Sequence, residues 1–273
     1  MRQRNNGRLL AMFIPAIAVF MAFFLLPLAR LAVTSALGPA GVKIYLAAII
    51  TPRYLESLVY TILLSVGVTI LTLIISGIAG VFLTRNDFRG KRLLVSLLTF
   101  PLAFPGVVVG FMIILLVGRQ GLIGDITQWV SGEKLVLAYS MTGLFLGYLY
   151  FSIPRTITTL MASAEKMDRN LEEAARSLGA SPWRVVKDVL IPALLPGLIS
   201  AGAICFATSM GAFGTAFTLA TNIDVFPIVI YTEFTLMANI SMAAALSIVL
   251  GLITWIALSV ARAAAGDTIA AAG

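Results

Sequence analysis

Residue types that carry chemistry are scarce in this chain. It has no histidine, and its one cysteine, Cys205, lies in an apolar segment, so the sequence offers neither a disulfide nor a common zinc site. Glu172 and Glu173 are adjacent, but neighbours on a helix point about 100° apart and make a weak acid/base pair. No G-x-x-x-x-G-K-[ST] phosphate loop occurs. The sequence therefore predicts a protein that is not an enzyme and binds neither cofactor nor metal.

The most informative spacing falls in a polar segment between the fourth and fifth apolar runs. Asp168 or Asn170 can cap a helix there, because acidic residues follow at its positive end. Gly179 is suited to end that helix. A second short helix is expected to begin at Ser181, with Pro182 in its first position. The segment is therefore predicted to be structured.

The first of these two helices carries one narrow apolar stripe with small residues at its centre. Glu172 and Arg176 lie on the opposite side, spaced for an i,i+4 ion pair. A stripe of this kind fits a groove on another protein, or it packs against the protein's own bundle, and the sequence leaves both readings open. The stripe residues follow i, i+3, i+4 and i+7: Leu171, Ala174, Ala175 and Leu178.

The amino-acid composition of the whole chain is typical of a membrane protein. It is 60% hydrophobic and 11% charged, whereas soluble domains are about 25% charged. Six uncharged runs each reach the roughly 20 residues that cross a bilayer. We expect an all-α membrane protein, with residues 1–273 as one transmembrane domain and a loop at 155–190. The predicted spans are 9–29, 58–84, 93–117, 135–154, 193–216 and 237–261.

The positive charges predict the direction of these spans. With the N-terminus inside, the cytoplasmic side holds fourteen of the nineteen Lys and Arg, so both termini are expected to be cytoplasmic. The net charge of +7 then reflects membrane topology and lipid contact, not nucleic acid. Arg2, Arg4 and Arg8 also resemble a signal peptide, but the run that follows is long and lacks a nearby A-x-A site, which favours an uncleaved first span. A bacterial inner membrane is the expected location.

A few residues inside the spans are candidates for lining a substrate pathway. Pro101 and Pro105 each remove a helical hydrogen bond, which lipid tolerates poorly. Thr208, Ser209 and Phe213 form a partly polar stretch in the apolar fifth span. No charged residue lies near the middle of any run, which disfavours a secondary carrier and predicts a pathway with little charge selection.

One motif in the polar segment resembles a known family. Glu173-Ala174-Ala175, Gly179 after three residues, and Val189-Leu190-Ile191-Pro192 after nine more are similar to the E-A-A-x3-G-x9-I-x-L-P signature of binding-protein-dependent ABC importer permeases. Valine at 189 and isoleucine at 191 depart conservatively from that pattern. The resemblance implies the type I ABC importer permease fold, with six transmembrane helices and both ends inside.

The resemblance also implies how the chain would work. Its loop would be a coupling helix that docks on an ATPase subunit, and ATP and Mg would be bound by that subunit. The partners would be two ATPases, a second permease subunit, identical or paralogous, and a periplasmic solute-binding protein. The docking residues would be Glu173, Ala174, Ala175 and Gly179, with Leu171 and Leu178 as apolar flanks.

The substrate is less well defined by the sequence. Among such permeases the chain is most similar to the spermidine/putrescine and 2-aminoethylphosphonate group. Ala212 stands where some polyamine members carry an acidic residue, so a 2-aminoethylphosphonate or opine-like solute is preferred over a polyamine. The alternatives are an ATP-independent channel or secondary carrier, and an assembly factor without transport activity.

Overall fold

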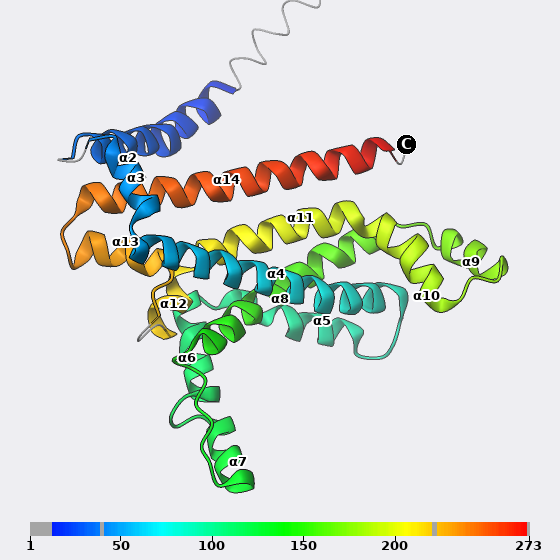
Figure 1. Cartoon of the computed structure of the whole chain (residues 1–273). Coiled ribbons are helices and arrows are strands. Elements are labelled where there is room, and N and C mark those ends of the chain that lie inside the picture. The colour runs from blue at the N-terminus through cyan, green and yellow to red at the C-terminus, as the bar shows by residue number, and fades with distance from the viewer. Residues whose placement is uncertain (1–12, 39–40, 220–222, 272–273) are drawn as a thin grey trace, which may run out of the picture. The chain divides into compact units, whose positions relative to one another are not determined.

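The chain is all-helical in the computed structural model, which describes residues 13–38, 41–219 and 223–271 (Figure 1). No strand occurs in these residues. The chain divides into two compact units, Met1–Leu55 with Val229–Gly251, and Glu56–Ile228 with Leu252–Gly273. The expected first residues of the first span, with Arg2, Arg4 and Arg8, lie outside the described part.

The helices follow one another with short connections. A continuous helix, Phe13–Ala36, contains the π-helical segment η1 (Met21–Leu25) and α2 (Leu26–Ala36). The later elements are α3 (Lys43–Ile50), α4 (Pro52–Arg85), α5 (Lys91–Thr99), η2 (Phe100–Ala103), α6 (Gly106–Val117), α7 (Leu122–Ser131), α8 (Met141–Glu165), α9 (Arg169–Ser177), α10 (Pro182–Val185), η3 (Val186–Leu190), α11 (Ile191–Met210), α12 (Phe213–Leu219), α13 (Phe226–Thr235) and α14 (Ile240–Ala271).

Five stretches of the described chain are long and apolar enough to cross a membrane. They are Phe13–Ala36, Pro52–Arg85, Gly106–Ser131, Pro182–Met210 and Ile240–Gly266.

Helix α8 is not among the five, although its 25 residues would reach about 37 Å at about 1.5 Å each. It was expected to end at residue 154, but it continues to Glu165 and carries Arg155 inside. The charge that ended the apolar run does not end the helix, because arginine is a good helix former. The count of six spans and their orientation stay predictions, which reporter fusions at Phe88 and Asp125 would test.

Two of the expected spans are interrupted in the second unit. The third was expected as one helix over 93–117, but it stops at α5 and resumes at α6. Phe104 and Pro105 between them are extended, at φ −93°, ψ 132° and φ −61°, ψ 150°. Both prolines lack an N–H donor, and Pro105 forces Phe104 before it out of the helical region, whereas Phe100 before Pro101 stays helical. The fifth span is also interrupted, at Gly211 and Ala212 between α11 and α12, where the sequence has no proline.

The two broken segments pack together. The Thr215 hydroxyl of α12 donates a hydrogen bond of 3.0 Å to the carbonyl of Gly106 at the start of α6. The fully buried Tyr148 of α8 donates one of 2.8 Å to the carbonyl of Ala212, in the second break. Gly110 of α6 lies so close to α12 that an added Cβ would overlap the Thr218 hydroxyl. The breaks are therefore held by specific contacts across α6, α8 and α12.

We expect Gly110→Ala to loosen this packing. The new methyl group meets the half-buried Thr218 hydroxyl and nearby backbone, and overpacking of this kind destabilises by about 1–3 kcal/mol. Gly77→Ala is the matched control, since no atom lies within 4 Å of a Cβ at that position. The measurement is the apparent unfolding temperature of the purified protein in detergent. Equal temperatures for the two variants would show that α6 and α12 are not in contact there.

The first unit is organised around a buried carboxylate. Glu233 of α13 accepts a hydrogen bond of 3.0 Å from the Tyr54 hydroxyl and one of 3.3 Å from the Asn239 side chain. Arg53 lies 3.7 Å from the same carboxylate. A buried charge is tolerated when it is paired and hydrogen-bonded. This cluster therefore links the start of α4 to α13 within the first unit.

Candidate functional site: the α9–α10 loop and the helix-break cavity

The polar segment folds as the sequence predicts, into two short helices. Asp168 is the N-cap of α9, and its carboxylate accepts a hydrogen bond of 2.9 Å from the Asn170 N–H. Ser181 is the N-cap of α10 and accepts one of 3.4 Å from the Arg184 N–H. Pro182 takes the first helical position of α10. Both predicted helix starts are confirmed, and Asp168 is the cap of the first.

The joint between the two helices is a Schellman motif. Gly179 has φ +82°, in the left-handed region that glycine adopts without strain. Its N–H donates to the Arg176 carbonyl at 2.9 Å, and the Ala180 N–H donates to the Ala175 carbonyl at 3.0 Å. These two bonds fix the direction in which the chain leaves α9.

The apolar stripe of α9 faces outward. Leu171 is 53% exposed and Leu178 is 88% exposed, and Ala174 between them is exposed as well. The stripe therefore does not pack on the chain's own bundle, which was one of the two readings left open by the sequence. Trp183 of α10, 70% exposed, adds a large apolar side chain to the same loop. Exposed leucines and a tryptophan on a short structured loop are typical of a surface that docks on another protein.

The opposite side of α9 faces the bundle. Glu172 does not pair with Arg176 as expected but with Arg85 at the end of α4, 2.5 Å away, in an orientation that makes no hydrogen bond. Their side chains are 13% and 14% exposed. The expected i,i+4 pair is wrong because a tertiary partner lies closer and shields the carboxylate from water. Arg176 stays exposed and has no carboxylate partner among the described residues.

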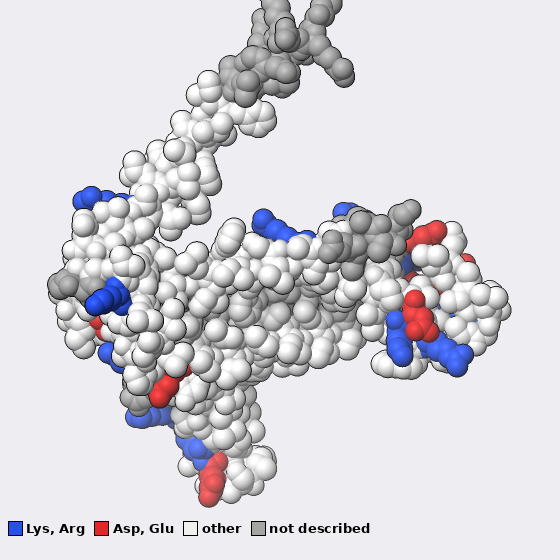
Figure 2. All heavy atoms as spheres, turned by 45° about the horizontal axis from the view of Figure 1, so that its top comes forward, with Lys and Arg blue, Asp and Glu red and all other residues white. Residues whose placement is uncertain are grey.

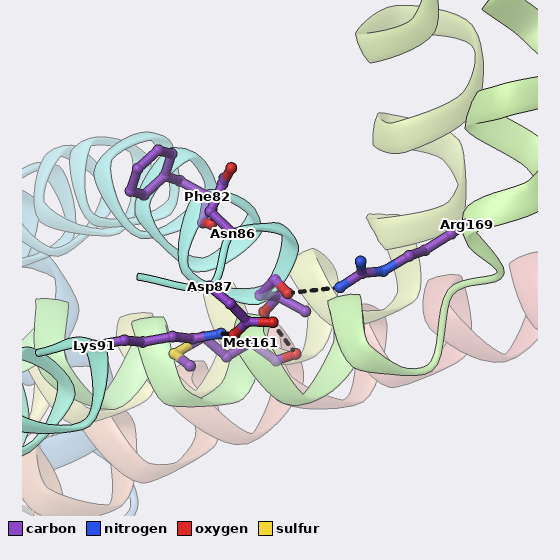
Figure 3. Close-up of polar contacts among 7 residues, drawn as sticks. Phe82, Asn86, Asp87, Lys91, Met161 and Arg169 are labelled. Atoms are coloured by element: carbon purple, nitrogen blue, oxygen red, sulfur yellow. Dashed lines mark hydrogen bonds and ion pairs between the residues drawn. The ribbon is translucent and has the colours of Figure 1, made fainter. Parts of the chain in front are cut away.

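A second contact attaches the loop to the same end of α4 (Figure 3). The Arg169 guanidinium donates a hydrogen bond of 3.1 Å to the Thr84 carbonyl. The Thr84 hydroxyl donates one of 3.4 Å to the Met161 carbonyl of α8. The start of α9 is thus tied to α4, and the same residue of α4 is tied to α8.

Other charged groups gather around this end of the second unit. On the face shown in Figure 2, blue and red side chains gather at the end that carries α9 and α10, and the surface beside them is largely uncharged. Lys91 donates a hydrogen bond of 2.8 Å to Asp87, and this contact holds the pKa of the Asp87 carboxyl below its ordinary value. Charged side chains at this end of the second unit are expected if α9 and α10 lie outside the hydrocarbon region of the membrane.

A separate cavity of about 300 Å³ opens where the two helix breaks meet α8. Its only charged lining residue is Arg155, which is exposed. The lining residues come from three parts of the second unit: Pro101, Leu102, Phe104, Gly106 and Val107 from the first break, Phe151 and Arg155 from α8, and Ala212 and Gly214 from the second break.

Of the five residues predicted to line the substrate pathway, some lie at the cavity and others do not. Pro101 lines the cavity, and Pro105 and Phe213 are flanked by residues that line it. Thr208 lies on α11, about one turn before the cavity-lining Ala212. Its hydroxyl donates a hydrogen bond of 2.9 Å to the Ile204 carbonyl of the same helix. Ser209 is fully buried. Residues of both helix breaks therefore line the cavity, whereas Thr208 and Ser209 do not.

Three residues of these sites were not identified from the sequence. Arg155 was assigned to the loop after the fourth span. It lines the cavity because helix α8 continues past it to Glu165. Arg85 was counted only for its charge. Trp183 carried a usable signal, since an isolated tryptophan in a polar segment is unusual. Among the described residues, no group of three or more His, Cys, Asp or Glu side chains could hold a metal.

The chain belongs to the family of binding-protein-dependent transport system inner membrane components, whose family model matches residues 73–266. It is therefore a non-catalytic, multi-span permease component of a binding-protein-dependent ABC importer, located in the bacterial inner membrane. Over 167 residues it is 38% identical to the molybdenum transport system permease protein ModB of Escherichia coli (strain K12), covering 59% of this chain and 72% of ModB. It is also 33% identical over 236 residues to sulfate permease 2, chloroplastic, of Chlamydomonas reinhardtii, covering 84% of this chain and 63% of that protein.

Solved structures share the fold. A permease chain of the bacterial alginate ABC transporter, in complex with an alginate pentasaccharide-bound periplasmic protein, matches with a TM-score of 0.82 over 94% of this chain and 93% of that chain, at 15% identity. A chain of the inward-facing MetNI methionine ABC transporter matches with a TM-score of 0.58 over 80% and 98%, at 16% identity. The expected ABC importer permease fold is confirmed. The expected 2-aminoethylphosphonate, opine or polyamine-like substrate finds no support among these proteins.

Proposed function

We propose that this chain forms half of the translocation pathway of an ATP-driven importer and that α9 is its coupling helix. The observation that carries the proposal is the exposed stripe of Leu171, Ala174 and Leu178 on a helix whose other face is anchored to the bundle. A docking helix must present apolar surface to its partner and must also transmit force to the membrane helices. Helix α9 meets both requirements.

The residues of α9 take different roles in this proposal. Leu171, Ala174, Ala175 and Leu178 enter a groove of the ATPase subunit, where the two small residues allow close approach. Glu173, exposed beside the stripe, contacts the rim of that groove. Gly179 ends the helix so that α10 can turn back toward the membrane. ATP and Mg are bound by the ATPase subunits, and a second permease subunit and a periplasmic solute-binding protein complete the importer.

We further propose that the solute is a small tetrahedral oxyanion. The relatives reported above are named for molybdenum and sulfate transport, and molybdenum dissolves in aerated water as the molybdate dianion. The cavity between the helix breaks supports an anion better than a polyamine, because its one charged lining residue is an arginine.

The test is to purify the chain together with its ATPase and binding protein and to reconstitute them in proteoliposomes. Uptake of radioactive sulfate and molybdate is compared with that of 2-aminoethylphosphonate and putrescine, with and without ATP. The proposal expects ATP-dependent uptake of an oxyanion that needs the binding protein. Uptake without ATP would favour a channel or secondary carrier, and selective uptake of putrescine would overturn the substrate class.

A further inference from the structure

The cavity at the helix breaks contains a charge with no protein partner. Arg155 lies ten residues before the end of α8, so about 15 Å of helix separates it from the loop at Glu165. Among the described residues no Asp or Glu forms an ion pair with it. Lone charged side chains within membrane helices are unfavourable and usually mark a substrate or ion pathway.

The other walls of the cavity provide no competing negative charge. Its remaining lining residues are one proline, two glycines and residues with apolar side chains. The first turn of α6 also begins at this cavity, and Pro105 at its N-cap offers no side-chain hydrogen bond to the free N–H groups. The positive end of a helix therefore adds to the field of the guanidinium.

We infer that Arg155 makes this cavity selective for anions and binds the oxyanion during its passage through the permease. The inference rests on the proposed function and assigns its charge selectivity to one side chain. It differs from the expectation of a pathway with little charge selection, which depended on placing Arg155 in the loop after the fourth span. A guanidinium suits this task, because its planar donors match the oxygens of a tetrahedral anion.

A lipid headgroup phosphate offers the same chemistry as a dissolved oxyanion. Long basic side chains near membrane surfaces often reach toward headgroups. The experiment must therefore separate an anion in the pathway from an anionic lipid that neutralises Arg155.

The test measures charge selectivity directly, in the complete transporter in proteoliposomes. Leu102, an exposed lining residue, is replaced by cysteine in a Cys205→Ser background. The reaction rates of an anionic and a cationic methanethiosulfonate of similar size are compared. Arg155→Gln should lower the anionic-to-cationic rate ratio about tenfold, as expected for one charge acting over several ångströms in a partly polar medium. Arg155→Lys should retain most of the ratio.

Arg119→Gln is the matched control. This arginine follows the other end of α6, about 18 Å along the helix from Gly106, so its loss should leave the ratio unchanged. An equal change in Arg119→Gln would show a general surface effect and would overturn the inference. So would a ratio that depends on Arg155 in phosphatidylcholine vesicles but not in vesicles rich in phosphatidylglycerol, since the lipid would then be the partner.

Uptake by the same variants completes the test. With Leu102 intact, Arg155→Gln should reduce sulfate or molybdate uptake at least tenfold, while Arg119→Gln transports normally. Unchanged uptake in Arg155→Gln would overturn the inference. If the unmodified transporter takes up neither anion, the proposed substrate class fails, and the thiol rates still decide whether Arg155 selects by charge.

Discussion

Ala174→Glu is expected to abolish ATP-driven uptake while the protein still inserts into the membrane. Ala174 is exposed at the centre of the stripe, between Leu171 and Leu178. A glutamate there would lose its water on docking without a partner, which costs several kcal/mol. Each leucine contributes only about 1.5–3 kcal/mol by burial, so the penalty offsets much of the docking energy. Association with the ATPase should weaken more than hundredfold.

The measurement combines membrane level, co-purification with the ATPase, and uptake. Insertion should survive, because glutamate is a good helix former and position 174 is exposed. Arg176→Glu is the matched control, since it adds the same carboxylate to an exposed position of α9 on the side opposite the stripe. Normal co-purification and uptake by Ala174→Glu would show that the stripe faces something other than the ATPase.

Glu172→Gln is expected to separate ATP hydrolysis from transport. The substitution keeps the shape of the side chain but leaves the Arg85 guanidinium without its carboxylate, at a site where both side chains are less than 15% exposed. Breaking a buried pair at one partner costs about 3–5 kcal/mol, and the remaining exposure reduces this to about 1–3 kcal/mol here. Helix α9 would then be held to α4 mainly by the Arg169 contact. Its outward stripe is unchanged, so the ATPase should still bind.

We therefore expect normal co-purification with uptake reduced at least fivefold relative to ATP hydrolysis. Arg176→Gln removes a charge from the exposed side of the same helix and should transport normally. The charge-reversed pair, Arg85→Glu with Glu172→Arg, should recover part of the lost uptake if the ion pair itself is responsible. Full activity in Glu172→Gln would mean that α9 transmits force without this contact.

The local structure of the α9–α10 loop could be predicted from the sequence because it depends on neighbours in the chain. Asp168 and Ser181 cap helices through bonds to residues two or three positions away. Gly179 ends α9 because its backbone adopts the left-handed conformation. The apolar period of the stripe likewise identifies one face of the helix without reference to the rest of the fold.

Contacts between distant segments could not be predicted in this way. Glu172 prefers Arg85, which is 87 positions earlier, over the nearby Arg176, and no local pattern encodes that choice. The third apolar run shows two prolines, but the sequence does not say whether they kink one helix or interrupt it, as the extended Phe104 and Pro105 do. Arg155 ended an apolar run and was therefore placed in a loop, although a helix can continue through a charge when a cavity admits water.

The joint between α9 and α10 restricts how this loop can change during evolution. Only three residues, Leu178, Gly179 and Ala180, separate the last residue of α9 from the cap of α10 at Ser181, and two of them donate the bonds that close α9. One inserted residue would displace either the left-handed position or the cap, and would change the direction in which α10 leaves α9. Homologous loops should therefore differ by substitution at exposed positions and keep the same length across this joint.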